Sequence, residues 1–303
     1  MELQTSKDCR DAYREILQGY SHISEQNLYI KHFKEPDLGA LDTLYKECSE
    51  ETNEIGLSSE KEQLKFLQKK EYWTQEEEQE YINAGFAVTD AFLFQEKLKD
   101  EKQRISFNDT IEEQLKILKK IEDQRRELVE PTIESYCEKR VNEHYVRFAL
   151  FRDGEFKEPM FSEEEFQNLS FRDLADLVRT YNKAISKYKE RNIKRIGVCY
   201  FFLNSFLMAE NDPIKFYGKS VLDMTVYQQN LFAKGKFNKY ILEEGKSPPE
   251  SMYETFETGG MDEVVSWFDN THLQIQAERD RQKAQASAQS ANQGRGAGFV
   301  RRS

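Results

Sequence analysis

The most suggestive chemical motif in the sequence is the run Gly218-Lys219-Ser220, which precedes a segment with helical spacing of apolar residues. A glycine-rich turn with lysine and serine before a helix can cradle phosphate and magnesium. The full pattern would need another glycine at position 213, where the chain has Pro213, and the preceding segment lacks the character of a strand. We interpret the motif as a turn that starts a helix. A nucleotide-binding enzyme or regulator using the Gly218 turn remains an alternative function.

Histidine and cysteine, the side chains most used in catalysis and metal binding, are few and scattered. The histidines form no His-Glu-x-x-His pair and no triad spacing; they are His22, His32, His144 and His272. The cysteines form no Cys-x-x-Cys pair and have no histidine at ligand spacing; they are Cys9, Cys48, Cys137 and Cys199. The sequence therefore predicts free thiols, no catalytic, cofactor or metal site, and a protein that is not an enzyme.

The overall composition favours a helical, charged protein with protein partners. Charged residues make up 33% of the chain, and only 6 prolines and 14 glycines interrupt 303 residues. A β-sandwich or barrel would need a turn signal every ~8–12 residues, so long helices are expected instead. A net charge of −11 disfavours binding to nucleic acid or to an anionic membrane surface. The amino terminus lacks a basic region followed by an apolar run, so a cytoplasm is the predicted location.

The segment 196–242 is the most apolar and aromatic part of the chain and is predicted to form its core. One buried helix is expected over 196–209, too short for a bilayer, which needs about 20 apolar residues. Asp212-Pro213 should stop this helix, and a second helix past Gly218 should end near Gly235 or continue to Leu242. The aromatic side chains exceed what one helix face can hide, so either neighbouring helices or a partner protein must cover them. The candidate partner-binding residues here are Phe202, Phe206, Phe216, Tyr217, Tyr227 and Phe232.

A long antiparallel helical hairpin is predicted over 74–130. Thr74 with Glu77 forms a capping box that should start the first helix. The connection is expected at 106–108, before a second helix that restarts near Asp109. The apolar face of this second helix is predicted to be buried; it contains Ile111, Leu115, Leu118, Ile121 and Leu128. A charge in place of Leu115 is then expected to cost several kcal/mol.

Three shorter segments complete the expected secondary structure. The run 28–33 fits either a strand or a helical turn, and the Asp153-Gly154 turn allows at most a two-stranded ribbon. A last helix is expected over 261–282. The remaining segment 284–303 has little to bury and is predicted to be a disordered, basic tail. It is either a passive extension or a docking peptide whose candidate partner-binding residues are Phe299, Val300, Arg301 and Arg302.

These elements predict an all-α, multi-helix protein with a long hairpin, a compact aromatic-rich C-terminal helical core and a disordered C-terminal tail. The expected divisions are N-terminal short helices over 1–73, the hairpin over 74–130, a helical core domain over 131–260, a C-terminal helix over 261–283 and a tail over 284–303.

Two stretches of the sequence carry a resemblance to known proteins. They read GLSSEKEQLKFLQKKEYWTQEEEQEYI, starting at Gly56, and FYGKSVLDMTVYQQNLFAKGKFNKYILEEGKSPPESM, starting at Phe216. With them the chain resembles uncharacterised helical proteins encoded among the tail and virion genes of tailed bacteriophages, some of which are tail assembly chaperones. The resemblance brings no catalytic residues. It implies a non-enzymatic tail or virion assembly or structural protein, located in the host cytoplasm or the virion.

The partners that this resemblance implies are other phage tail or virion proteins, with self-association as a further expectation. A host-directed adaptor protein is the remaining alternative.

Overall fold

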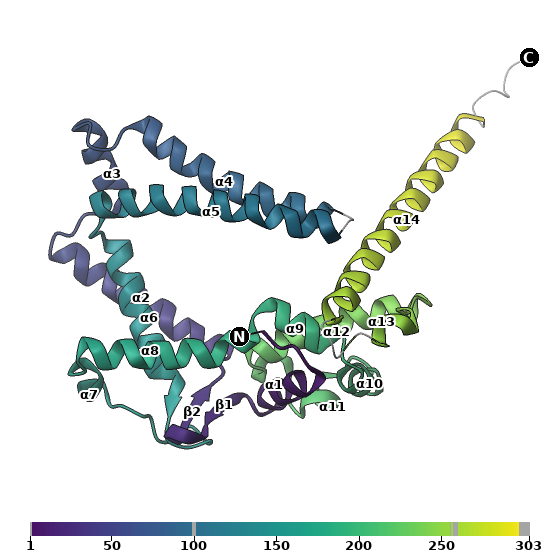
Figure 1. Ribbon diagram of the computed structural model, residues 1–303, viewed down its shortest axis with the longest axis horizontal. Helices are drawn as coiled ribbons and strands as arrows, with labels where there is room; N and C mark the ends of the chain where they lie inside the picture. The colour runs from purple at the N-terminus through teal and green to yellow at the C-terminus, as the bar shows by residue number, and fades with distance from the viewer. Residues whose placement is uncertain (1, 99–100, 255, 257–259, 297–303) are drawn as a thin grey trace, which may run out of the picture. The chain divides into compact units, whose positions relative to one another are not determined.

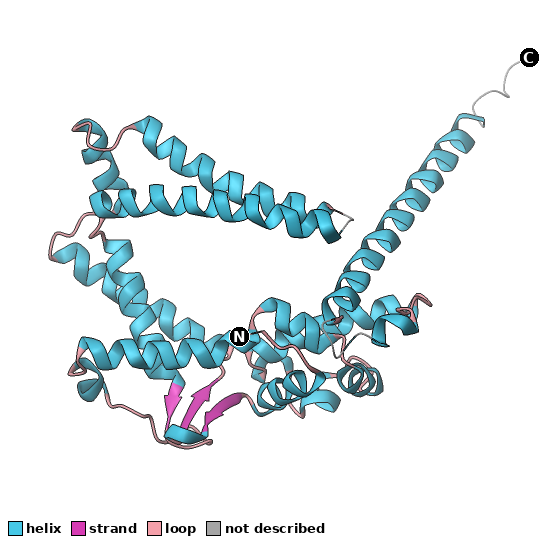
Figure 2. Ribbon diagram, in the orientation of Figure 1, coloured by secondary structure: helices cyan, strands magenta, loops and turns pink. Residues whose placement is uncertain are grey.

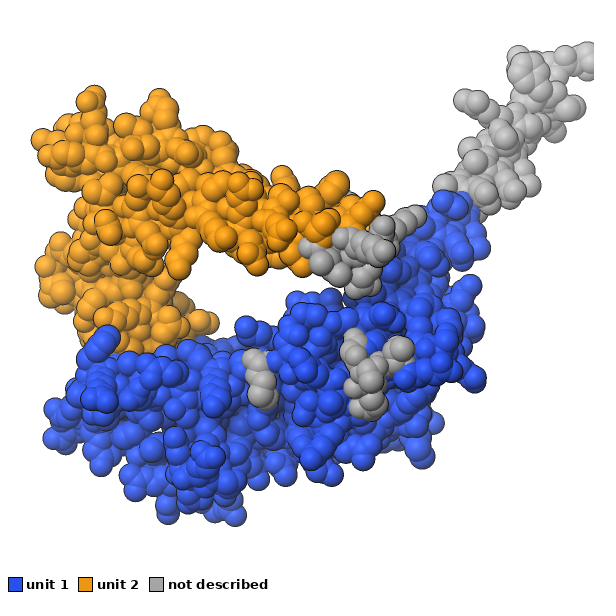
Figure 3. Space-filling model, viewed as in Figure 1, with its two compact units in different colours: residues 1–39, 145–303 blue, residues 40–144 orange. Residues whose placement is uncertain are grey.

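The computed structural model describes residues 2–98, 101–254, 256 and 260–296. The fold is all-α in its main features, as predicted, with one small antiparallel sheet (Figures 1 and 2). The chain divides into two compact units (Figure 3). Unit 1 combines residues 1–39 with 145–303, and unit 2 comprises residues 40–144. This division does not coincide with the expected boundaries at 73/74 and 130/131, because the amino-terminal helix packs into the C-terminal core.

The core of unit 1 is built by five helices from both ends of the chain. They are α1 (Ser6–Gln18), α9 (Glu190–Gly197), α10 (Tyr200–Met208), α12 (Val226–Glu243) and α14 (Met261–Gly296). Each contributes fully buried side chains, such as Ile16, Ile196, Phe202, Leu231 and Phe268. The apolar segment that the sequence singled out therefore lies at the centre of unit 1, and α1 and α14 pack on it.

The core segment is more broken than expected. Instead of one helix over 196–209, α9 ends at Gly197 and α10 begins at Tyr200, with the buried residues Val198 and Cys199 between them. The change of direction allows both helices to contact α12. Pro213 begins the short helix α11 (Pro213–Tyr217), because Asp212 caps it and proline is tolerated at the first helical position.

Helix α12 continues past Gly235, which the sequence offered as one possible end. A Cβ atom at Gly235 would lie 2.6 Å from the ring of Phe206. Gly235 therefore allows α12 to approach α10 closely and does not terminate the helix. The N-terminus of α12 is set by Thr225, whose side chain and that of Gln228 form a capping box.

A three-stranded antiparallel sheet belongs to unit 1 and includes residues 28–31, for which the sequence left a strand or a helical turn open. Its strands are β1 (Tyr20–Ile23), β2 (Leu28–Lys31) and β3 (Leu150–Phe151), in that order. Tyr29 pairs with Phe151 of β3. The 153–154 turn does form, since the Asp153 carboxylate accepts hydrogen bonds from the backbone N–H groups of Glu155, Lys157 and Glu158. The minimal ribbon across this turn is confirmed, since Phe151 pairs antiparallel with Pro159 and the backbone N–H of Met160 donates to the carbonyl of Leu150 (2.9 Å). The sequence did not reveal that β3 also pairs with β2, a strand some 120 residues earlier.

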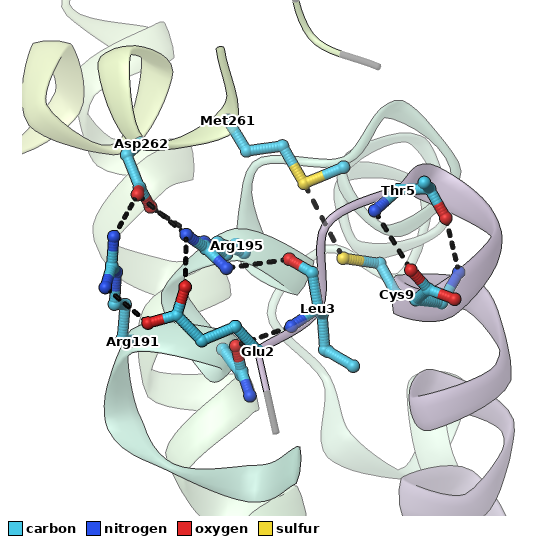
Figure 4. Close-up of polar contacts among 10 residues, drawn as sticks. Glu2, Leu3, Thr5, Cys9, Arg191, Arg195, Met261 and Asp262 are labelled. Atoms are coloured by element: carbon cyan, nitrogen blue, oxygen red, sulfur yellow. Dashed lines mark hydrogen bonds and ion pairs between the residues drawn. The ribbon is translucent and has the colours of Figure 1, made fainter. Parts of the chain in front are cut away.

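The segment before α1 is tied to α9 and α14 (Figure 4). The backbone N–H of Leu3 donates to Asn192 (3.1 Å), and Arg195 donates to the carbonyl oxygen of Leu3 (2.8 Å). Arg195 also donates two hydrogen bonds of 2.7 Å to the Asp262 carboxylate, to which Arg191 donates a third. Burial opposes ionisation, but the hydrogen bonds from Arg195 and Arg191 lower the pKa of Asp262 to about 2.

Unit 2 contains the predicted hairpin, formed by α4 (Gln75–Lys97) and α5 (Glu101–Val129), which pack along each other (Figure 1). The connection therefore falls between Lys97 and Glu101. Residues 106–108 lie inside α5, where Ser106 donates to the Gln103 carbonyl and the ring of Phe107 packs on Phe94 (5.2 Å). The expected turn at 106–108 was wrong because these residues belong to a continuous helix, in which the side chain of Asn108 accepts a hydrogen bond from Gln95 of α4 (2.7 Å).

The other elements are shorter or connect the two units. Two helices cross the boundary between the units, α2 (Glu35–Glu54) and α6 (Ile133–Ala149). The remaining elements are η1 (Ser24–Gln26), α3 (Glu60–Lys69), α7 (Glu163–Gln167), α8 (Phe171–Ile185), η2 (Ser186–Tyr188), η3 (Val221–Asp223) and α13 (Glu250–Glu254). Among the described helices, none combines the length and the apolar character that crossing a membrane requires.

Helix α14 runs to Gly296, past its expected end near 282. It thus takes up part of the segment predicted as a tail. The candidate docking residues Phe299, Val300, Arg301 and Arg302 lie outside the described residues.

Candidate protein-binding surface

The aromatic residues predicted to bind a partner lie inside unit 1. Phe202, Phe206 and Phe232 are buried, with Phe206 5.1 Å from Phe232 between ring centroids. The half-buried members of the set pack on this core; they are Phe216, Tyr217 and Tyr227. The sequence left open whether neighbouring helices or a partner protein cover these rings. In the structure, neighbouring helices cover them. The prediction that Phe202, Phe206 and Phe232 bind a partner was therefore wrong, because they are buried, whereas partner binding by Phe216, Tyr217 and Tyr227 stays a prediction.

The Gly218 turn lacks the structure of a phosphate-binding loop. It follows helix α11, not a strand, and Gly218 is the left-handed residue that ends that helix. The hydroxyl of Ser220 donates to Asp223 (2.7 Å), and burial, together with Lys34, lowers the pKa of Lys219. A loop that binds phosphate would join a strand to a helix whose N–H groups point at the ligand. This turn gives the nucleotide-binding alternative no support.

A buried serine–histidine contact, which the sequence did not reveal, lies beneath the sheet of unit 1. Ser21 Oγ lies 3.0 Å from His32 Nε2 and 2.6 Å from the hydroxyl of Tyr188. The hydroxyl of Tyr188 donates to the carboxylate of Glu15, which also binds Lys187 Nζ (2.6 Å). Ser21, His32 and Tyr188 are all buried. A serine–histidine pair raises the question of nucleophilic catalysis, which requires histidine to accept the serine proton.

The direction of the hydrogen bonds argues against that chemistry. The Glu15 carboxylate can only accept hydrogen bonds, so the hydroxyl of Tyr188 donates its proton to Glu15. The hydroxyl of Ser21 must then donate to the oxygen of Tyr188. Because the proton of Ser21 is used there, Nε2–H of His32 must donate to the oxygen of Ser21. His32 is therefore not oriented as a base toward Ser21. Among the described residues, no hydrogen-bond partner lies near His32 Nδ1, where a triad would have a carboxylate. Burial, with a smaller effect from Lys187, lowers the pKa of His32 to about 3. This network is a structural link between α1, the sheet and η2.

The cysteines and metal-binding residue types likewise do not converge. Cys9, Cys48, Cys137 and Cys199 are all buried and reduced. Within the part of the chain that the structure describes, no three His, Cys, Asp or Glu side chains are grouped closely enough to hold a metal ion.

The base of the hairpin in unit 2 is held by a polar cluster around Arg125. Arg125 donates to both oxygens of Glu78 (2.9 and 3.0 Å) and to Glu60 (2.5 Å). The indole of the buried Trp73 donates to Glu78 as well (2.8 Å). Burial opposes ionisation of the Glu78 carboxyl, but the hydrogen bonds from Arg125 and Trp73 outweigh burial and lower the pKa of Glu78. The cluster fixes the start of α4 against the end of α5 and so sets which side of α4 faces outward.

The side of α4 that faces away from α5 is apolar and largely exposed. Val88 and Ala91 are buried on the side toward α5. On the opposite side, by helical periodicity, Phe86 is 64% exposed and Leu93 49% exposed. We call this side the α4 face; it consists of Ile82, Gly85, Phe86, Thr89, Phe92 and Leu93, of which all but the half-buried Gly85 are exposed. Adjacent exposed apolar side chains of this size are uncommon on a protein without a partner there.

The α4 face lies on an acidic helix. Between Gln75 and Lys97 the sequence has six acidic residues and one lysine. Most of the acids are in the first two turns, where Glu76, Glu77 and Glu80 are exposed. The sequence placed Phe86, Phe92 and Leu93 on the helix, but it did not separate the side covered by α5 from the side left open. The signal that could have found the α4 face is the excess of apolar residues over those that a single neighbouring helix can cover.

Comparison of the chain with protein-family models, with curated proteins and with solved structures returned no match.

Proposed function

We propose that this protein is a non-enzymatic bacteriophage tail or virion assembly or structural protein that acts through protein–protein contacts. The exposed α4 face is the observation that carries the proposal. It replaces the buried aromatic residues of unit 1 as the contact surface. The resemblance of the sequence to tail and virion gene products supplies the biological setting, which is the host cytoplasm or the virion.

The physical basis of the proposal is the apolar surface of α4 that the hairpin leaves exposed. A helix that packs on only one neighbour should carry apolar residues on one side, yet α4 carries them on two. Burial of a phenylalanine or leucine side chain is worth roughly 1.5–3 kcal/mol. Covering Phe86, Phe92 and Leu93 would therefore supply a substantial part of the free energy of a specific contact, since about 8 kcal/mol corresponds to micromolar affinity.

The test is capture of partners encoded beside this gene. The tagged full-length protein is co-expressed with the neighbouring tail and virion proteins and recovered by its tag. We expect Phe86→Asp to reduce capture by at least about tenfold, because a charge would be desolvated in the contact.

Phe171→Asp is the matched control, since Phe171 is 82% exposed at the start of α8 and outside the α4 face. It should capture as wild type does, and both variants should keep the wild-type melting temperature. Failure of the wild type to capture any tail or virion protein, or undiminished capture by Phe86→Asp, would contradict the proposal. Recovery of a host protein alone would favour the host-directed adaptor.

A further inference from the structure

The α4 face has a spacing that reads the same in both directions. Its central residues Ile82, Phe86, Thr89 and Leu93 are separated by four, three and four positions. If a second α4 lies antiparallel on the first, Ile82 falls opposite Leu93 of the second copy, and Phe86 falls opposite its Thr89. Both contacts then occur twice, as a two-fold symmetric interface requires.

The sizes of the facing residues are complementary in this register. The large ring of Phe86 meets the small Thr89, and Phe92, on the flank, comes next to Gly85 of the second copy. A Cβ atom at Gly85 would find nothing within 4 Å, so this position offers room for a side chain of the second copy. Large side chains opposite small ones allow two helices to interlock at close distance.

The charges favour the antiparallel orientation over the parallel one. A parallel pair would bring the exposed acids Glu76, Glu77 and Glu80 of both copies together. In the antiparallel pair the acidic first turns of the two copies lie at opposite ends of the contact and so stay apart. Like charges that face each other on neighbouring helices are destabilising, so the acidic first turns set the orientation more than they add affinity.

We infer that the occupant of the α4 face is a second copy of this chain, packed with its α4 antiparallel to the first. This rests on the proposed function only in taking the α4 face as a contact surface. The two hairpins would then form a four-helix arrangement with α4 and its copy in the middle and α5 on either side.

The test exchanges the large and the small residue of the central contact and measures the dimer dissociation constant of the full-length protein by sedimentation. Thr89→Phe opposes two rings, and Phe86→Thr leaves a gap, so each should weaken the dimer by about tenfold or more. The double variant Phe86→Thr/Thr89→Phe restores one ring opposite one threonine at both contacts. We expect it to regain most of the lost affinity, which a general loss of apolar surface does not predict.

Two further variants guard the interpretation. Gly85→Leu should occupy the space that Phe92 of the second copy needs and so weaken the dimer, while the melting temperature of the monomer should be no lower, because a Cβ atom at that position meets nothing within 4 Å. Phe171→Asp should dimerise as wild type does.

Three outcomes would overturn the inference. The wild type remains a monomer at ~100 μM, a concentration that would populate even a weak dimer. The single variants dimerise normally. The double variant regains nothing, which would exclude this register. A monomer that still captures a virion protein through Phe86 would leave the proposed function standing, whereas a dimer that captures none would remove that function alone.

Discussion

At the scale of single residues, Gly85 and Gly235 lie inside helices and have opposite surroundings. Gly235 faces the buried ring of Phe206, whereas Gly85 faces open space. The sequence could not distinguish these two positions, because glycine occurs at helix ends, in close helix contacts and on open helix faces alike. The Ser21–Tyr188 contact was hidden for a related reason, since it joins positions 167 residues apart.

Alanine at these two glycines should change stability in opposite directions. Gly85→Ala should stabilise the protein by up to about 1 kcal/mol, because alanine has the higher helix propensity. Gly235→Ala gains the same propensity but forces a Cβ atom 2.6 Å from Phe206, so overpacking of about 1–3 kcal/mol should dominate. Urea unfolding of the two variants and the wild type measures both changes. Stabilisation by Gly235→Ala would show that Phe206 yields easily.

Asp262 should make the protein acid-sensitive in a defined range. Its folded pKa of about 2 lies below the usual aspartate value of 3.8, so the ionised carboxylate stabilises the folded state above pH ~4. That stabilisation is lost as the pH falls from ~4 toward 2. We expect Asp262→Asn to be less stable than wild type at pH 6, with the difference shrinking by pH 2.5, as measured by thermal melts. A difference that stays constant with pH would show that the ion pair with Arg195 contributes nothing.

At the scale of elements, the sequence predicted where a helix begins but did not predict which side of a helix is buried. The capping box that starts α4 at Thr74 was predicted and is confirmed, because it involves two residues only three positions apart. Whether an apolar residue on α5 is covered depends on how α4 packs against it. The sequence of α5 alone holds no information on that packing. Leu115, predicted to be buried, is 42% exposed, while Ile111 on the same helix is buried.

A charged side chain should have different effects on stability at Ile111 and at Leu115 of α5. Ile111→Asp places an unpaired carboxylate in a buried site and should cost about 3–5 kcal/mol. Leu115→Asp lets the carboxylate reach water and should cost no more than about 1 kcal/mol, contrary to the expectation from the sequence. Circular-dichroism melts of both variants compare the costs. Equal destabilisation would mean that Leu115 is covered in solution, for example by a second molecule, which dilution would reveal.

At the scale of the whole molecule, the helical class followed from composition, but the division into units did not. Unit 1 joins the first 39 residues to the last half of the chain. For example, the side-chain amide of Gln228 donates to the carbonyl of Ile16 (2.8 Å). No spacing within either segment announces such a pairing, so the sequence divided the chain where helices and prolines suggested boundaries.

The C-terminal helix should be essential only over its first half. Val264, Phe268 and Ile275 are buried in unit 1, and from Gln276 to Lys283 the side chains are exposed. Ending the chain after Lys283 should leave the melting temperature within about 2 °C of wild type. Ending it after Gly260 removes several buried apolar side chains at roughly 2–5 kcal/mol each, which should unfold unit 1. Calorimetry of the two truncated proteins decides the matter, and a stable unit 1 without α14 would contradict the core described above.

The insertion of unit 2 between the two segments of unit 1 also fixes an order of events during translation. Helix α1 leaves the ribosome well before the helices it packs against, because α9 and α12 lie beyond residue 189. The hairpin needs only residues 40–144 and can fold while the rest is still being made. The nascent chain therefore holds an amphipathic α1 with its apolar side uncovered for most of its synthesis, which is the period when it is most exposed to chaperones and to misassociation between neighbouring nascent chains.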